Sequence, residues 1–282
     1  MFIPQDRYIK VGKLNTRYMA EGEGTPVVLI HGMGGSAAGY LLNFGALAAH
    51  HRVYAMDLPN HGGTDPVGDA RPGPAYMSGF VNDFMSELKI ERAHVVGHSL
   101  GGGIALRLAM DYPRRVDRLV LVAALGLGRQ LTPLFRIVSL PLLGEFLAAR
   151  DYGMDIEKYA AATRKEARNA SFITDELIAE LYRVERKPEH VRPLLQAVRQ
   201  WVDWTGVKKS VYAPILRQLP SLKNQTLIIW GRQDSIIPLS NGELAARTMP
   251  HARLEVIDRS NHVPLFEQPE IFNRLVLDFL KE

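Results

Sequence analysis

The residues best suited to chemistry lie in the stretch Gly97-His98-Ser99-Leu100-Gly101. This stretch follows a strand-like run, residues 93–96, and precedes a helix-like run, residues 104–110. A serine in a sharp strand-to-helix turn is exposed to an incoming carbonyl, and the flanking glycines let the backbone and the helix approach closely. The first amides of the helix then face the place where negative charge develops. The pattern predicts Ser99 as a nucleophile.

A serine hydroxyl is a weak nucleophile at neutral pH, so it needs a base in hydrogen-bond reach and a carboxylate that orients the base. Asp234 follows the apolar run 226–230, and His262 follows the run 254–257. Because the carboxyl ends of parallel strands share one edge of a sheet, we expect these two residues and Ser99 to meet there. Three other acids remain as alternatives: Asp57, Asp203 and Asp258.

The stretch His31-Gly32-Met33-Gly34-Gly35-Ser36 directly follows another apolar run, residues 27–30. Its glycines allow a backbone amide to approach a ligand, and the amide after the nucleophile can complete an oxyanion hole. We assign the amides of Met33 and Leu100 to this role. Four further residues are expected to support the site: His31, Gly32, Gly34 and His98. For His31 a structural hydrogen-bonding role is favoured over that of a base.

Composition bounds the class of protein. The 282 residues are 46% hydrophobic and 23% charged, which suits one globular domain with a large insertion. A net charge of +4 without a long Lys/Arg run indicates no nucleic-acid partner. The chain has no cysteine, which excludes disulfides and thiol nucleophiles. Without a metalloprotease motif or a close His/Asp cluster, we expect no metal and no cofactor.

The first residues and the apolar segments indicate the cellular location that is expected. Residues 1–7 lack a basic region followed by a long apolar stretch, which argues against a secretory signal. No 18-residue apolar segment is free of charge, so no membrane span is expected. We therefore expect a cytoplasmic protein that acts on a small molecule. The sequence does not indicate an oligomeric state.

Short apolar runs alternate with helix-like stretches in the first 124 residues. Strands are expected at 8–11, 14–19, 27–30, 53–56, 93–96 and 119–123, and helices at 40–49 and 77–88. The alternation returns with strands at 226–230 and 254–257 and helices at 242–247 and 269–280. This pattern predicts an α/β fold with a mostly parallel, doubly wound sheet of about eight strands.

The alternation of strands and helices stops after the sixth expected strand. Residues 127–218 contain no confident strand, but helix-like segments lie near 137–149, 155–169, 174–184 and 188–202. We predict a core formed by residues 1–126 and 219–282 and a helical cap formed by residues 127–218. The apolar segment 131–147, interrupted by two prolines and a glycine, is expected to pack within the cap, with a mobile lid as the alternative.

Together these motifs resemble the α/β-hydrolase superfamily over nearly the whole chain. The likeness rests on the elbow at Ser99, on His31-Gly32, on Asp57-Leu58-Pro59, on Gly231-Arg232-Gln233-Asp234 and on Asn261-His262. The resemblance implies the chain order Ser, Asp, His for the triad. Related dehalogenases and epoxide hydrolases carry aspartate at the elbow, so a serine there disfavours both activities.

The C-terminal third and the stretch Lys187-Pro188-Glu189-His190 are similar to the carbon–carbon bond hydrolases of aromatic meta-cleavage pathways. Those enzymes commonly have asparagine before the nucleophile and tryptophan after the histidine, where this chain has His98 and Val263. These departures favour a carboxylic ester hydrolase, carboxylesterase- or lipase-like, that acts on short to medium acyl chains through an acyl-enzyme. A carbon–carbon hydrolase of a meta-cleavage-type dienoate is the alternative. A non-catalytic small-ligand receptor on the same fold is a further one.

Overall fold

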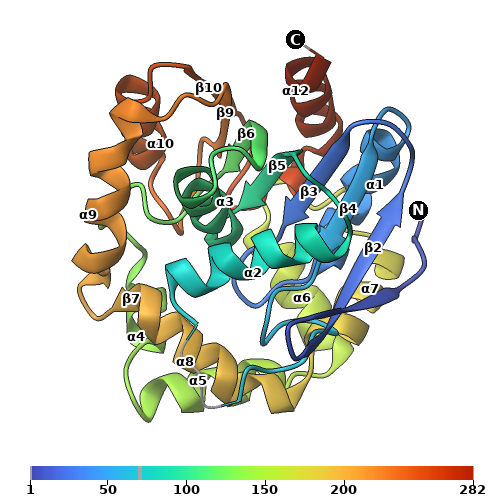
Figure 1. Ribbon diagram of the computed structural model, residues 1–282. Helices are drawn as coiled ribbons and strands as arrows, with labels where there is room; N and C mark the ends of the chain where they lie inside the picture. The colour runs from blue at the N-terminus through green and yellow to red at the C-terminus, as the bar shows by residue number, and fades with distance from the viewer. Residues whose placement is uncertain (1, 69–71, 282) are drawn as a thin grey trace.

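The computed structural model describes residues 2–68 and 72–281, so residues 1, 69–71 and 282 of the predicted core lie outside the description. Eight strands form one sheet in the order β1-β2-β4-β3-β5-β6-β9-β10 (Figure 1). In chain order, they are β1 (Arg7–Val11), β2 (Leu14–Glu21), β3 (Pro26–Ile30), β4 (Arg52–Met56), β5 (Ala93–His98), β6 (Val116–Val122), β9 (Thr226–Gly231) and β10 (Ala252–Ile257). β1 and β2 are antiparallel and the other six strands run parallel to one another. The predicted mostly parallel sheet is confirmed.

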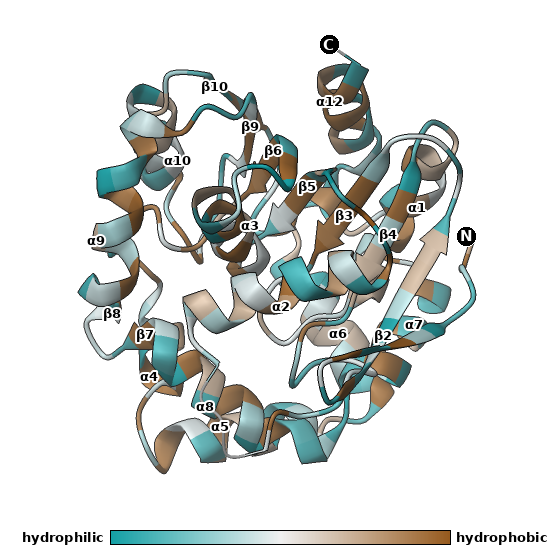
Figure 2. Ribbon diagram, viewed as in Figure 1, coloured by the Kyte–Doolittle hydropathy of each residue, from teal (hydrophilic) through white to brown (hydrophobic). Residues whose placement is uncertain are grey.

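Helices cover both faces of the sheet because the central strands are apolar on both sides. Four of the five residues of β3 are completely buried. α2 (Pro74–Glu87), α3 (Leu100–Asp111) and α10 (Leu239–Thr248) pack on one face. α1 (Leu41–Ala48) and α12 (Pro269–Lys281) pack on the other. In Figure 2 the central strands are hydrophobic, whereas hydrophilic residues lie along the outer helices.

The residues between β6 and β9 form a helical insertion beyond the carboxyl ends of the strands (Figure 1). Its helices are α4 (Pro133–Val138), α5 (Leu143–Tyr152), α6 (Ile156–Glu166), α7 (Asp175–Glu185), α8 (Val191–Trp201) and α9 (Lys209–Gln218), with two short 3-10 turns, η2 (Pro188–His190) and η3 (Leu219–Ser221). None of the helices within the described ranges is long and apolar enough to cross a bilayer.

Three local predictions for the insertion were wrong. The expected helix 137–149 is split into α4 and α5, because Leu142 takes a positive φ of 66° at the start of α5. α9 was not predicted, and its internal Pro214 conceals the helical pattern. A two-stranded pair also forms where no strand was expected, β7 (Val202–Asp203) with β8 (Gly206–Val207).

A buried ion pair ties the edge of the parallel sheet to the antiparallel strands. Asp57, directly after β4, is fully buried and accepts hydrogen bonds from Arg17 Nη1 at 3.0 Å, from the Ala37 amide at 2.6 Å and from the Gly63 amide at 2.7 Å. Arg17 on β2 is also buried, and it pairs with Asp6 at 2.5 Å. Two charges removed from water in this way are stabilised because each faces an opposite charge, although Arg17 Nε is buried without a hydrogen-bond partner among the described residues.

We predict that Arg17→Ala lowers the free energy of unfolding by about 3–5 kcal/mol, because it leaves the Asp57 carboxylate buried without its cation. Urea unfolding would measure the loss. Arg7→Ala, at an exposed position on β1, is the matched control and should change the free energy by less than about 0.5 kcal/mol. Equal effects of the two substitutions would contradict the prediction.

Candidate active site

Ser99 lies in the sharp turn between β5 and α3. Its backbone angles, φ 54° and ψ −114°, are unusual for a residue with a side chain. A Cβ atom at Gly97 would overlap the carbonyl of Gly101, and a Cβ atom at Gly101 would overlap the carbonyl of Ile30. The amide of Ser99 donates to the carbonyl of Val122 on β6 at 2.8 Å, which fixes the turn to the next strand. The turn thus requires glycine on both sides of the serine.

The structure brings together the three predicted catalytic residues. His262 Nε2 lies 3.0 Å from Ser99 Oγ, and His262 Nδ1 lies 2.9 Å from Asp234 Oδ2. The Asp234 side chain is fully buried, and its other oxygen accepts the amides of Ile236 and Ile237 at 2.8 and 2.9 Å. In this arrangement Nδ1–H donates to the aspartate, so Nε2 can accept the proton of the serine. This is the geometry of a nucleophile, its base and an orienting acid.

The two residues whose amides are the predicted oxyanion donors both lie near Ser99. Met33 borders the same small pocket as Ser99, and Leu100 is the first residue of α3. A Cβ atom on Gly32 would lie 3.2 Å from Ser99 Cβ, so this loop packs directly against the nucleophile. Gly34 has a φ of 73°, which turns the loop. Within the described residues neither the Met33 nor the Leu100 amide donates a hydrogen bond, so both can serve a developing oxyanion.

The neighbouring histidines are neutral scaffold residues. Burial lowers the pKa of His31 to about 4 and the pKa of both His61 and His98 to about 3. His31 Nδ1 donates to the Gly32 carbonyl at 2.7 Å, and its Nε2 accepts the Leu58 amide at 2.9 Å. His98 Nε2 donates to the carbonyl of His262 at 2.9 Å. This contact joins the elbow to the loop of the candidate base.

The three alternative acids contact residues other than His262. Asp57 forms the buried ion pair with Arg17, Asp203 accepts the amide and the hydroxyl of Thr205, and Asp258 pairs with Arg232. Asp234 is the carboxylate that contacts His262. Among the described residues, no three His, Cys, Asp or Glu side chains are grouped so that they could hold a metal ion.

The pocket at Ser99 is small and apolar. It has a volume of about 10 Å³, which holds no more than one water molecule. Its lining residues are Met33, Ser99, Leu125, Leu131, Phe135, Val202, Ile236 and Ile237. Leu131 and Phe135 belong to the segment 131–147, so part of this apolar segment borders the nucleophile. At this volume the pocket is too small for an acyl group.

A polar cluster lies beside the candidate site. It consists of Asp151, Tyr159, Glu166, Glu185 and Arg186. Glu185 accepts a hydrogen bond from the hydroxyl of Ser36 at 3.0 Å and one from the hydroxyl of Tyr159 at 3.2 Å. Ser36 ends the stretch 31–36 that contains Met33, which is called the oxyanion loop below. Arg186 pairs with Asp151 at 2.5 Å and lies over the Tyr159 ring at 4.3 Å. The carbonyl of Glu166 accepts the side-chain amide of Asn261, the neighbour of His262, at 2.9 Å. The cluster therefore contacts both the oxyanion loop and the loop of residues 261–263, which is called the histidine loop below.

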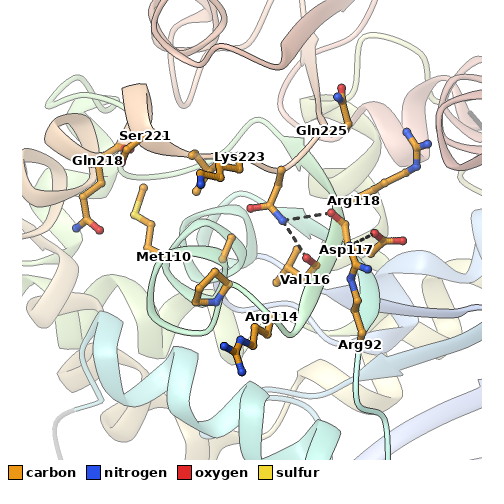
Figure 3. A pocket seen from close by; sticks show the side chains of 14 residues that line it. Arg92, Met110, Arg114, Val116, Asp117, Arg118, Gln218, Ser221, Lys223 and Gln225 are labelled. Carbon is orange, nitrogen blue, oxygen red and sulfur yellow. Dashed lines mark hydrogen bonds and ion pairs between the residues drawn. The ribbon is translucent and has the colours of Figure 1, made fainter.

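A larger groove, of about 660 Å³, lies at the opposite end of the sheet (Figure 3). Val116, at the amino end of β6, and Gln225, just before β9, border it. Asn224 donates to the carbonyls of Val116 and Asp117 there, and Arg92 pairs with Asp117. Ser99 follows the carboxyl end of β5, so size alone would select the wrong end of the molecule as the reactive site.

Sequence reasoning missed Arg186, Glu185 and Glu267. Glu267 has one visible signal, a charge directly after the apolar run Val263-Pro264-Leu265-Phe266, whereas Glu185 and Arg186 stand in a charged stretch without such a signal. Glu267 is 2% exposed and accepts backbone amides on both sides of His262. Its partners are set by the fold and not by a local motif.

The fold and these loops define a hydrolase of the α/β class. Residues 25–269 match the family model described as alpha/beta hydrolase fold, and the chain belongs to this family. It is 32% identical to the 2-hydroxy-6-oxononadienedioate/2-hydroxy-6-oxononatrienedioate hydrolase of Comamonas testosteroni, over 92% of this chain and 88% of that protein. It is 33% identical, with the same coverage, to the 2-hydroxy-6-oxo-6-phenylhexa-2,4-dienoate hydrolase of Delftia acidovorans.

Solved structures give the same relationship. A meta-cleavage product hydrolase from Pseudomonas fluorescens IP01 superimposes with a TM-score of 0.79 at 30% identity, covering 98% of this chain and 97% of that one. A putative lipase from Acinetobacter baumannii also has a TM-score of 0.79, at 23% identity, with 98% and 90% covered. The second likeness shows the fold alone. The relatives thus favour the carbon–carbon hydrolase alternative, and ester hydrolysis is not specifically supported by them.

We predict that Glu185 makes stability depend on pH. Burial raises the pKa of its carboxyl from 4.5 to about 7. Between these values the unfolded chain loses the proton while the folded chain keeps it, so stability falls as the pH rises from about 4.5 to 7. Relative to Glu185→Gln, the Tm of the unmodified protein should fall by at least about 2 °C from pH 5 to pH 8. Scanning calorimetry would measure it, with Glu157→Gln, exposed on α6, as the control. Parallel Tm curves for Glu185→Gln and the unmodified protein would contradict the assignment.

Proposed function

We propose that this protein is a serine hydrolase that cleaves a carbon–carbon bond next to a ketone in a meta-cleavage-type dienoate. The observation that carries the proposal is the chain of contacts from Asp234 through His262 to Ser99, at 2.9 and 3.0 Å, beside an apolar pocket and a polar cluster that contains Arg186. A meta-cleavage dienoate has the matching halves, an apolar acyl group beside its ketone and a carboxylate at the other end. The relatives with dienoate-hydrolase names support this choice.

The proposed reaction starts with a proton shift within the substrate. The 2-hydroxyl proton moves to C5, which gives a diketone whose C5–C6 bond can break. Ser99 Oγ then adds to the C6 ketone carbon while His262 Nε2 takes its proton and Asp234 stabilises the imidazolium. The oxyanion accepts the Met33 and Leu100 amides, each worth about 3–4 kcal/mol in the transition state.

Collapse of this adduct breaks the C5–C6 bond. The electron pair enters the conjugated enol fragment, which takes its proton from His262, and the acyl group stays on Ser99. Water then gives a proton to His262 and attacks the acyl carbon, which releases a carboxylic acid and restores the serine. The polar cluster is the proposed site for the substrate carboxylate. Arg186 supplies its cation, and Arg186 Nε is buried without a hydrogen-bond partner within the described residues.

Carboxylic ester hydrolysis is the second candidate, and one observation favours it. His98 stands before the nucleophile, and its Nε2–H is already donated to the His262 carbonyl. It therefore cannot donate this hydrogen to a dienoate, whereas a simple ester needs no donor at that position. The ester route uses the same nucleophile, base and amides and ends with loss of an alcohol. If neither substrate is turned over, the results would instead support a non-catalytic ligand receptor.

We further propose that residues 127–218 act as a cap that selects the substrate. Leu131 and Phe135 in this range border the Ser99 pocket, and Arg186 lies in the same range. The proposed substrate is a small molecule, and the cytoplasm is the proposed compartment.

Turnover of a meta-cleavage dienoate and of p-nitrophenyl esters from acetate to laurate distinguishes the candidate substrates. We expect the kcat/KM for the dienoate to exceed that for every ester by at least about 10-fold. Ser99→Ala should reduce both activities by at least about 10³-fold, because the nucleophile is lost. Spectrophotometric steady-state assays measure both. Ester turnover that exceeds dienoate turnover would instead support the second candidate, and no serine-dependent turnover would support the receptor.

We predict that Arg186 binds the carboxylate of the dienoate. Arg186→Gln should raise the KM for the dienoate by about 10- to 100-fold, because a charged hydrogen bond to the carboxylate is lost. The KM for p-nitrophenyl butyrate, which carries no carboxylate, should change less than about 2-fold. Arg150→Gln, exposed near the end of α5, is the matched control. An equal rise for both substrates would mean that Arg186 only maintains the fold.

A further inference from the structure

Glu267 is a buried carboxylate without a cation. It is 2% exposed, at the end of the short helix α11 (Pro264–Glu267), and no Lys, Arg or His side chain within residues 2–68 and 72–281 pairs with it. A carboxylate removed from water costs several kcal/mol unless donors replace its hydration. The donors that surround the Glu267 carboxylate therefore explain how it can be buried.

Backbone amides take the place of a cation. The Asn261 amide lies 3.0 Å from Oε1 and 2.9 Å from Oε2, and the Val263 amide lies 3.2 Å from Oε1. These two amides stand immediately before and immediately after His262 in the chain. Hydrogen bonds to an ionised carboxylate are stronger than those between neutral groups. The carboxylate thus holds the backbone on both sides of the candidate base.

The third donor comes from the helical insertion. The Arg168 amide, just after α6, lies 2.7 Å from Glu267 Oε2. The Asn169 side chain donates to the backbone carbonyl of Glu267 at 2.9 Å. One carboxylate oxygen therefore accepts hydrogen bonds from both the histidine loop and the insertion.

Asn261 extends the same connection to the acid. Its side-chain oxygen accepts the amide of Ser235, the residue after Asp234, at 2.8 Å and the Ser235 hydroxyl at 3.0 Å. Its side-chain nitrogen donates to the carbonyl of Glu166 in α6 at 2.9 Å. The loops of the base and the acid are thereby fixed to each other and to the insertion.

We propose that Glu267 is a positioning residue that holds His262 in line with Ser99 and Asp234, and that the Arg168 amide makes this alignment depend on the seating of the helical insertion. A displacement of about 1 Å in a reacting group can cost about 100-fold in rate. The inference rests on the proposed role of Ser99 as nucleophile and of His262 as its base. It does not depend on the identity of the substrate.

The test measures how fast a fluorophosphonate labels Ser99, because this reaction needs a working serine–histidine pair and no particular substrate. Glu267→Gln replaces one acceptor oxygen with an NH₂ group that faces an amide donor. We expect labelling at least about 10-fold slower. We also expect the acid limb of the pH–rate profile for labelling to move to lower pH, because the imidazole is less well aligned with Asp234. Glu270→Gln, exposed on the next turn, is the control and should label at the unmodified rate.

A second pair of variants tests the link to the insertion, and keeps the inference testable if Glu267→Gln does not fold. Arg168→Pro removes the amide donor, whereas Arg168→Ala keeps it and removes the side chain. We expect Arg168→Pro to label at least about 3-fold more slowly than Arg168→Ala. Equal rates for this pair would overturn the link to the insertion.

Unchanged labelling and an unchanged acid limb in Glu267→Gln, with only the Tm lowered, would overturn the positioning role. Labelling of Ser99→Ala at the unmodified rate would contradict both the proposed nucleophile and this inference. Absence of dienoate turnover would contradict the proposed substrate alone, because the labelling arms still measure the role of Glu267.

Discussion

The close approach of backbone to backbone at the Ser99 turn is the constraint on which the rest of the structure depends. Neither Gly97 nor Gly101 has space for a side chain, and Ser99 is held at a φ of 54°. Such a conformation persists only where its surroundings determine it. β6 supplies one such contact through Val122, and the oxyanion loop supplies another by packing against Ser99. The parallel sheet therefore does more than present the serine, since its neighbouring strands maintain the turn.

Three buried carboxylates organise the loops around this turn in the same manner. Asp57 follows β4, Asp234 follows β9 and Glu267 follows the loop after β10, and each accepts at least two backbone amides. Loops at strand ends contain amides that no strand satisfies, and a carboxylate can satisfy several at once. The remaining contact differs among the three acids. Asp57 pairs with the Arg17 guanidinium, Asp234 contacts the His262 imidazole, and Glu267 accepts an amide of the helical insertion.

The sheet and the candidate triad could be predicted because their signals are local. Buried strands are short apolar runs, and Ser99, Asp234 and His262 each follow one of them. The insertion was less predictable, since Leu142 and Pro214 change or conceal the helical pattern. Glu267 and Arg186 were not assigned, because one partner of each is distant: the Arg168 amide lies 99 residues from Glu267, and Asp151 lies 35 residues from Arg186. The proposed contact of Arg186 with a substrate carboxylate belongs to this distant kind, which local sequence patterns do not reveal.

Reliance on backbone amides has a consequence for how such a chain can diverge. The candidate oxyanion donors at Met33 and Leu100, the two amides on Asp234 and the three on Glu267 belong to the peptide unit, which every residue except proline possesses. The side chains at these seven positions can change freely as far as the donors are concerned. These contacts therefore persist when the side chains at the seven positions change. A chain that shares only about a third of its residues with its relatives can retain them, while the pocket side chains are free to adapt to a new substrate.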